Sequence, residues 1–352
     1  MGCLYAKLGV NPKYTITKKN KGNIPIPNDA RILHIPIPCG RCQKCVEKAS
    51  REWAMRLKEE IKHDNKGKFI TLTFSDESLT MLEIEVKNRI AKAIEKGGNK
   101  NKLNKKLKGY DLENEKCKVA IEYFRERWRN QNRRSGSKEK IKYWFSTELG
   151  QTNTERIHMH GIVFTDDVER LKRNWTYGKL DVGQFCNEQT INYIVKYLSK
   201  VDPIHKYYKS IRLNSNGIGA GYVESRNAKN NKYNGEKTEL TYRDNKGMKT
   251  ALPSYLVRKL LTEDEREKNW IHKLDEMTMY VNGVKYDVGD EKGIKRYENA
   301  IKNARAKAKR IGYNDDKIDN NQKEYENKLR DIKNITRNQK VFKLNNNNKK
   351  AS

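Results

Sequence analysis

The sequence predicts an α+β protein, because it contains both paired strand patterns and amphipathic helix patterns. Residues 142–148 and 156–164 are rich in β-branched and aromatic side chains and are separated by a short turn, which predicts a hairpin. Residues 68–74 have the same strand character. Residues 46–63 carry apolar side chains at helical spacing, and another helix is expected to begin near Asn187.

The chain is strongly basic. Its 352 residues include 75 Lys and Arg against 45 Asp and Glu, for a formal net charge of +30. This length can form one large domain or two modest ones, and the charge favours a nucleic acid or an anionic membrane surface as partner, although a solubilising surface explains part of it. No apolar run approaches the ~18 residues of a membrane helix, and no secretory signal pattern is present. We expect a soluble, intracellular protein with no membrane partner.

Three thiols have the spacing of a metal-ligand turn. Cys39, Cys42 and Cys45 are each separated by two residues, so a tight turn can bring their thiolates onto one tetrahedral ion. A complete site needs a fourth ligand, for which Cys3 and His34 are candidates. The alternatives are a structural zinc site and a set of reduced, packed cysteines.

Composition divides the chain into four parts. Residues 1–66 contain the cysteines and the first helix, and residues 67–205 contain the strands and the helix near Asn187. Within that core, the Lys-rich stretch at about 82–116 is expected to form an inserted helical arm. Residues 206–262 are a peripheral turn and linker region. Residues 263–352 are a charged, mostly helical extension with an Asn/Lys-rich tail that is expected to be disordered.

The helix that begins near Asn187 carries two stripes at helical spacing. One is aliphatic, and the other consists of Tyr193, Lys196, Tyr197 and Lys200. The second stripe is displaced by two residues, about 200° around a helix of 3.6 residues per turn. A tyrosine pair at this spacing usually packs in a core, but the aliphatic stripe already has that role. The tyrosines and lysines are therefore expected to face a cleft or solvent.

A histidine pair lies on the second strand of the predicted hairpin. His158 and His160 project from the same strand face because side chains alternate. If the hairpin closes through residues 150–155, Glu148 lies beside His158, although a shift of one residue would remove it. Two histidines and one carboxylate leave coordination positions open, as a catalytic ion requires.

The tyrosines supply a nucleophile for such a site. A metal ion can polarise a phosphodiester, and a phenol can attack the phosphorus if its charge is offset. Lys196 and Lys200 each follow a tyrosine by three residues, where they can stabilise that charge. Because i and i+4 side chains are neighbours on a helix, Tyr193 and Tyr197 can serve one phosphate in turn.

These residues resemble the HUH endonuclease superfamily, and most nearly the rolling-circle replication initiators of microviruses of the gokushovirus type. The resemblance covers residues 39 to about 260, and three segments occur in the expected order: Phe69–Phe74, Glu148–His160 and Tyr193–Lys200. The cysteine segment and the sequences Gly217-Ile-Gly219 and Leu252-Pro-Ser-Tyr255 are also similar. Ile157 stands where these initiators usually have proline. The difference removes no reactive side chain, because proline has no chemical role at that position.

The resemblance implies a central antiparallel sheet flanked by helices, an RRM-like core with the metal and the tyrosines on one sheet face. It implies sequence-specific nicking of single-stranded origin DNA, with a 5′-phosphotyrosyl intermediate and a free 3′-OH, and later circle closure through the second tyrosine. The implied ion is Mg²⁺ or Mn²⁺, and histidine ligation also tolerates zinc. The implied partners are origin DNA and the replication helicase and polymerase of a bacterial host, in whose cytoplasm the protein would act.

Two other functions fit parts of the sequence. A plasmid initiator, relaxase or transposase of the same superfamily shares the histidine and tyrosine motifs, but the second tyrosine and the cysteines favour the viral type. A zinc-containing nucleic-acid-binding protein without catalysis accounts for the charge and the cysteines. It leaves the two-stripe helix unexplained.

Overall fold

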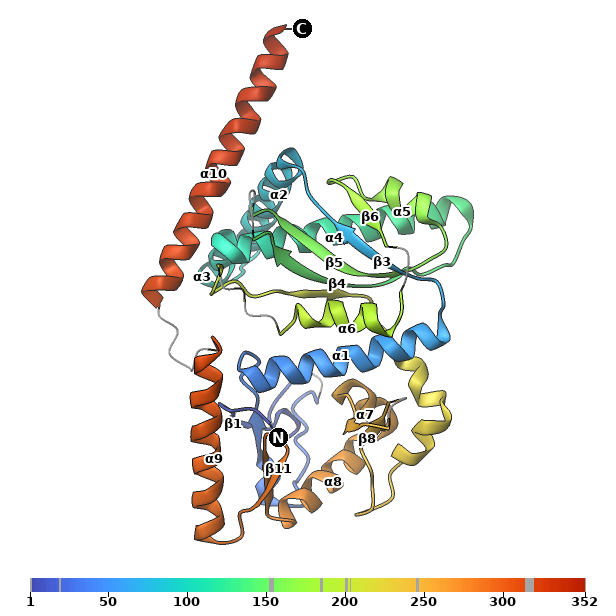
Figure 1. Ribbon diagram of the computed structural model, residues 1–352, viewed down its shortest axis with the longest axis vertical. Helices are drawn as coiled ribbons and strands as arrows, with labels where there is room; N and C mark the ends of the chain where they lie inside the picture. The colour runs from blue at the N-terminus through green and yellow to red at the C-terminus, as the bar shows by residue number, and fades with distance from the viewer. Residues whose placement is uncertain are drawn as a thin grey trace. The chain divides into compact units, whose positions relative to one another are not determined.

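The computed structural model describes residues 2–351 except 19, 152–154, 184–185, 200–201, 203, 245–246 and 314–319. It divides into two compact units (Figure 1). The cysteine unit comprises residues 1–59 and 219–318, and the sheet unit comprises residues 60–218 and 319–352. Helix α1 (Gln43–His63) belongs partly to each unit. These units differ from the four consecutive parts expected from composition, because each is assembled from two separate stretches of chain.

The sheet unit contains a five-stranded antiparallel sheet in the order β6-β3-β5-β4-β7. Its strands are β3 (Gly67–Leu72), β4 (Lys142–Leu149), β5 (Ile157–Phe164), β6 (Leu180–Val182) and β7 (Arg212–Asn214). The predicted hairpin is β4–β5, which pairs along its whole length from Lys142 opposite Phe164 to Leu149 opposite Ile157. The α+β class with a central antiparallel sheet is therefore confirmed.

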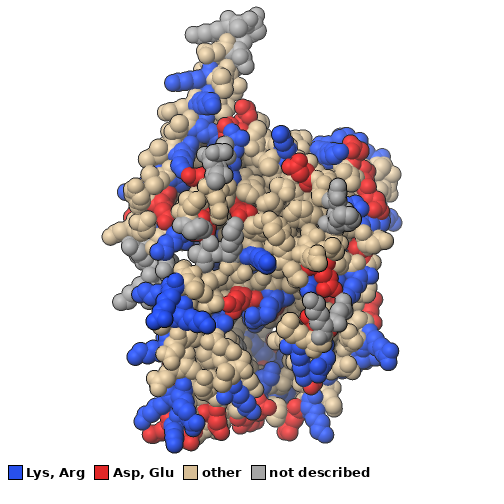
Figure 2. Space-filling model, in the orientation of Figure 1, with Lys and Arg blue, Asp and Glu red and all other residues tan. Residues whose placement is uncertain are grey.

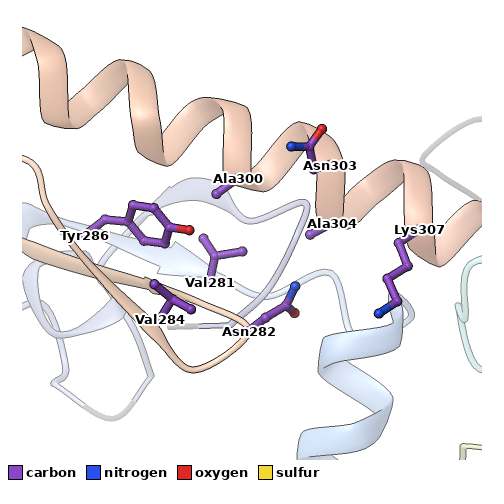
Figure 3. Close-up of a pocket in the computed structure, with 8 residues that line it drawn as sticks. All are labelled: Val281, Asn282, Val284, Tyr286, Ala300, Asn303, Ala304 and Lys307. Atoms are coloured by element: carbon purple, nitrogen blue, oxygen red, sulfur yellow. The ribbon is translucent and has the colours of Figure 1, made fainter.

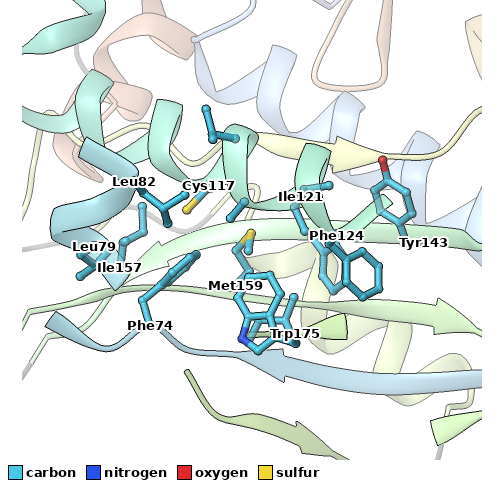
Figure 4. Packing of buried hydrophobic residues seen from close by; sticks show 14 of the residues in the cluster. Phe74, Leu79, Leu82, Cys117, Ile121, Phe124, Tyr143, Ile157, Met159 and Trp175 are labelled. Atoms are coloured by element: carbon cyan, nitrogen blue, oxygen red, sulfur yellow. The ribbon is translucent and has the colours of Figure 1, made fainter. Parts of the chain in front are cut away.

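Alternation of side chains gives the sheet two different faces. On one face, residues such as Ile70, Phe145 and Met159 are buried in the main hydrophobic cluster with α2 (Asp76–Glu95) and α4 (Gly109–Ser135). Figure 4 shows Met159 in this cluster with Leu82 and Phe124. The other face carries the histidines, and α6 (Glu188–Lys196) lies over it through ring contacts of its tyrosines with β3 and β5. The aliphatic side of α6 is buried, as its stripe predicted.

Gly161 is required for the close pairing of β5 with β4. A Cβ at this position would lie 2.1 Å from the carbonyl oxygen of Trp144, far inside van der Waals contact. A larger residue directly after the histidine pair would therefore push the two strands apart and disturb the register that aligns Glu148 with His158.

Residues 82–116 are mostly helical, as expected, but they pack against the sheet and do not project from it as an arm. Leu82, Val86 and Ile90 of α2 belong to the main cluster, as does Tyr110 of α4. Two short helices, Lys100–Asn104 (α3) and Lys105–Leu107, connect α2 to α4, and α5 (Val168–Asn174) also packs in this layer. The many lysines of this stretch lie between the apolar positions and mask their helical period.

The helical C-terminal extension is confirmed, and its last helix continues to Ala351 through the Asn/Lys-rich tail that was expected to be disordered. Helix α10 (Asn320–Ala351) packs on α2 and α4 within the sheet unit. Thr80 donates a 2.8 Å hydrogen bond to the Asn338 side chain, and the Gly109 backbone N–H donates one of 2.7 Å to the Asp331 carboxylate. These contacts come from residues that precede the Asn/Lys run at 345–350.

The cysteine unit is built from short hairpins and helices. Its strands are β1 (Lys7–Val10), β2 (His34–Ile37), β8 (Thr241–Arg243), β9 (Lys249–Ala251), β10 (Thr278–Val281) and β11 (Val284–Asp287). Its other helices are α7 (Ser254–Leu260), α8 (Glu263–Asp275) and α9 (Glu291–Arg310), with 3-10 turns at Pro12–Tyr14, Ala30–Leu33, Ala220–Glu224 and Arg226–Asn231. Residues 291–310 thus have a defined packing role: Ala304 and Ala308 of α9 pack with Leu4 and Cys42.

The surface carries mixed charges and a small pocket. Figure 2 shows Lys and Arg spread over the visible face of both units, with Asp and Glu among them. A pocket of about 250 Å³ in the cysteine unit lies between β10–β11 and α9, where Ala300 and Ala304 leave room (Figure 3). No helix in the described part of the chain has the length and apolar character needed to cross a membrane.

Candidate metal and tyrosine site

Three potential metal ligands meet on the sheet face opposite the main hydrophobic cluster. Strand pairing sets Glu148 directly opposite His158, as the sequence predicted, and His160 follows two residues later on the same face. The Nε2 atoms of His158 and His160 lie 3.5 Å and 3.4 Å from the same carboxylate oxygen of Glu148. The ligand atoms of all three residues lie within 4.8 Å of one another.

The surroundings of both imidazoles fit a divalent cation. Nδ1 of His158 is 3.3 Å from the backbone oxygen of Arg156, and Nδ1 of His160 is 3.0 Å from the Thr71 hydroxyl. These outer contacts orient the rings and leave each Nε2 directed toward Glu148. Ligands held at about 2.1 Å from one ion lie about 3 to 3.5 Å apart, which agrees with the spacing found here.

Both predicted tyrosines lie beside this group. The ring of Tyr197 stacks on that of His160 with centroids 5.2 Å apart and planes 19° apart. Tyr193 meets Tyr197 edge-on at 5.3 Å, and the Tyr197 hydroxyl donates a hydrogen bond to that of Tyr193. The Asn187 side chain caps the start of α6, and Tyr197 is the C-cap residue directly after the helix. The two hydroxyls are therefore adjacent to each other and to the metal ligands.

The environment of Tyr197 keeps its phenol protonated. Burial raises its pKa above the ordinary value, and the hydrogen bond with Tyr193 and the negative charge of Glu148 act in the same direction. Tyr193 is more open, with 51% of its side chain exposed. A cation bound between the three ligands would offset the Glu148 charge that faces Tyr197.

Lys196 and Lys200 were both predicted to stabilise negative charge at the site, and the structure describes only the first of them. Lys196 is the last residue of α6 and is exposed, so its proposed role in charge stabilisation stays a prediction. Lys200 lies outside the described residues.

A groove of about 570 Å³ begins at the histidines and continues along the ends of β3 and β5. Arg156 and Lys179 line it together with the hydroxyl residues Thr73 and Ser75. Arg156 also pairs with Asp76 at 2.6 Å. Basic and hydroxyl side chains along a groove are suited to the phosphates of an extended single strand.

Several of these neighbours could not be named from the motifs alone. Thr71 orients His160, and Phe69 stacks on the same ring with centroids 6.1 Å apart. Both residues could have been identified from the alternation of side chains in the strand at 68–74, which puts Phe69 and Thr71 on one face. Lys179 has no such pattern, since it comes to the groove through a loop after α5.

The cysteines form a second group of potential ligands. The sulfur atoms of Cys3, Cys39, Cys42 and Cys45 lie within 4.8 Å of one another, with Cys3–Cys42 at 3.9 Å and Cys39–Cys45 at 4.0 Å. Four thiolates at 2.3 Å from a tetrahedral zinc ion would be about 3.8 Å apart. The group among the described residues contains Cys3 and not His34, so the structure supports Cys3 as the fourth member.

We expect replacement of Cys42 by serine to remove zinc and unfold the cysteine unit. Structural zinc contributes an apparent ~10–16 kcal/mol to folding in small domains, and the buried Cys42 packs with Leu4 and α9. Metal analysis and thermal unfolding of purified protein measure both effects. Cys186→Ser is the matched control, because Cys186 lies outside the group. Protein that contains no zinc, with equal stability of both variants, would exclude the site.

The domain is thus an antiparallel sheet with a His-His-Glu group on the face opposite its main hydrophobic cluster. Residues 67–202 match the model of the family Replication-associated protein ORF2/G2P. The chain is also 28% identical over 220 residues to Replication-associated protein ORF2 of Spiroplasma virus 4. That match covers 55% of this chain and 59% of the relative, so the chain spans less than two thirds of that protein. No solved structure matches the chain significantly.

Proposed function

We propose that this protein initiates rolling-circle DNA replication as a metal-dependent endonuclease that nicks single-stranded origin DNA at a specific sequence. The observation that carries the proposal is the stacking of Tyr197 on His160, with Tyr193 beside it, next to three convergent metal ligands. A phenol and a metal group on one sheet face provide the nucleophile and the phosphate-binding site that the reaction needs. The match of residues 67–202 to a replication-associated family supports the same function.

The proposed ligands are Glu148, His158 and His160, and the ion is Mg²⁺ or Mn²⁺. The ion would supply charge that binds a non-bridging phosphate oxygen. One tyrosine oxygen forms a bond to phosphorus and loses its proton, while the bond to the 3′ oxygen breaks and that oxygen leaves as a 3′-OH. The DNA stays attached through a 5′-phosphotyrosyl bond. After synthesis, the second tyrosine makes the same attack on the renewed origin, and the released 3′-OH displaces the first tyrosine to close the circle.

The groove gives a testable DNA contact. We expect Arg156→Ala/Lys179→Ala to weaken single-stranded DNA binding and to reduce the slope of log affinity against log salt by about 1.4, since each phosphate contact contributes ~0.7. Lys285→Ala/Arg296→Ala, which removes two exposed charges from the cysteine unit, is the control. Titrations at several salt concentrations measure the slope. Equal slopes for the two variants would remove the groove from the DNA path.

The proposed activity is tested by transfer of labelled DNA to the protein. Purified protein is incubated with labelled single-stranded origin DNA and Mn²⁺, then separated under denaturing conditions. A metal-dependent band in which the label migrates with the protein is expected, together with a free 3′-OH fragment. Binding without cleavage under any divalent metal would refute the endonuclease.

The partners in this proposal are origin DNA and the helicase and polymerase of a bacterial host, in the cytoplasm of that host.

The four-sulfur group favours one other function, a zinc-containing nucleic-acid-binding protein without catalysis. That function predicts DNA binding that depends on zinc and yields no covalent product. A plasmid initiator, relaxase or transposase would instead form the adduct on DNA other than a viral origin.

A further inference from the structure

Helix α10 has its polar side toward the domain and its apolar side outward. The buried residues that face α2 and α4 include Glu326, Arg330 and Asn334, with 9%, 4% and 2% of their side chains exposed. The opposite side carries apolar residues that are 42% to 58% exposed, namely Tyr325, Leu329, Ile332, Ile335 and Phe342. A helix on the surface of a single domain normally has the reverse arrangement. We call these five residues the outer stripe.

The orientation of α10 is set by specific buried contacts. Arg330 donates a 2.9 Å hydrogen bond to the backbone oxygen of Glu155 and lies 3.4 Å from the fully buried carboxylate of Glu113. Tyr110 donates a 3.0 Å hydrogen bond to Glu326. Rotating the helix to bury the outer stripe would withdraw Arg330 from Glu113 and leave that buried charge less well compensated. The outer stripe is therefore left exposed by the packing of α10 on its own domain.

We propose that the outer stripe pairs with the α10 helix of a second copy of this chain in an antiparallel dimer. The charge distribution of the helix favours the antiparallel direction over the parallel one. Residues 320–333 contain three acidic and four basic residues, for a net charge of +1, whereas residues 334–351 contain five basic residues and no acidic one. Parallel pairing would set two basic halves side by side. Antiparallel pairing sets each strongly basic half against the nearly neutral half of the partner, where Glu324 is exposed while Glu326 and Asp331 are bound to their own domain.

A two-fold axis between Lys333 and Asn334 gives a self-complementary register. It places Ile332 opposite the partner's Ile335 and Tyr325 opposite the partner's Phe342. The same register sets Glu324 opposite the partner's Lys343, both of which are exposed in the single chain. Because the contact is isologous, each pairing occurs twice.

The length of the stripe sets the strength of the contact. Residues 325–342 span about 27 Å of helix, so the area buried falls below that of a standard stable interface, and we expect dissociation in the micromolar range. The dimer is therefore expected to appear with increasing protein concentration.

Sedimentation velocity of the full-length protein tests the dimer. Wild type is expected to shift from monomer to dimer as the protein concentration rises to about 100 µM. At that concentration, a dimer with a micromolar dissociation constant is mostly formed. Ile332→Glu/Ile335→Glu should stay monomeric, and its fold should persist because both side chains already face solvent. Ile294→Glu, at an exposed apolar site on α9, should dimerise like wild type. Wild type that remains monomeric over the whole range would overturn the proposal.

Charge exchange tests the antiparallel register. Glu324→Lys alone and Lys343→Glu alone each create two like-charge contacts and are expected to weaken dimerisation about tenfold. The variant with both changes restores opposite charges and should dimerise like wild type. If the double variant is as weak as the singles, the antiparallel arrangement is wrong.

Discussion

Phenylalanine at both Tyr193 and Tyr197 is expected to abolish the covalent protein–DNA product. Both hydroxyls are lost, while the ring of residue 197 can still stack on His160 and the aliphatic side of α6 stays buried. Loss of the nucleophile without loss of the fold therefore removes the first bond-forming step. Denaturing gels with labelled origin DNA measure the product, and circular dichroism measures the fold.

Each single tyrosine variant is expected to behave differently from the double variant. One hydroxyl remains beside the metal ligands in Tyr193→Phe and in Tyr197→Phe, so nicking should persist while circle closure fails. Tyr280→Phe, at a half-exposed tyrosine of the cysteine unit, should retain both steps. Complete loss of nicking in both singles would contradict an exchange between two tyrosines.

Alanine at both His158 and His160 is the second large change. Two of the three proposed ligands are removed, and the charge stabilisation that a bound cation gives to a phosphoryl transition state is worth several kcal/mol. We therefore expect the nicking rate to fall by about 10³-fold or more. Both side chains are only partly buried, so the sheet should survive the change.

The matched variant is Thr71→Val, which keeps all three ligands and removes the hydroxyl 3.0 Å from Nδ1 of His160. Loss of such an outer contact typically lowers metal affinity by 10- to 100-fold, so higher Mn²⁺ should restore its activity. Calorimetric titration with Mn²⁺ measures the affinity of each variant. A double histidine variant that still nicks at the wild-type rate with Mn²⁺ would rule out this ligand group.

The position of the site was predictable because two short-range patterns determine it. Alternation in the strand at 156–164 puts His158 and His160 on one face, and the short connection between strands fixes Glu148 opposite His158. The double stripe of α6 likewise predicts which side of that helix is buried. Both patterns follow from the repeat of the local backbone, so they can be recognised from the spacing of residues in the sequence.

Other features depend on contacts between distant segments, and local patterns do not contain them. Residues 82–116 contain so many lysines that their apolar period is hidden until Leu82 and Ile90 meet the sheet. The C-terminal tail lacks a conventional apolar face toward its domain, because Arg330 and Asn338 attach α10 through polar contacts. A polar, Asn-rich segment with that character has the composition of disorder.

The cysteine group could be predicted only in part from local patterns. The spacing of Cys39, Cys42 and Cys45 identifies a ligand turn, but the choice between Cys3 and His34 depends on the path of the chain before Cys39. The packing of Leu4 with Cys42 and α9 brings Cys3 to the group. Arg305 of α9 reinforces this by donating hydrogen bonds of 2.8 Å and 2.6 Å to the Leu4 carbonyl.

The most direct test of the central proposal is mass spectrometry of the peptide that contains Tyr193 and Tyr197, after incubation of the wild-type protein with single-stranded origin DNA and Mn²⁺. We predict that a nucleotide 5′-phosphate is attached to one of these two tyrosines, and that chelation of the metal prevents its formation. Metal-dependent cleavage that leaves both tyrosines unmodified would contradict the account, because the DNA would then be cut by hydrolysis and not by transfer to α6.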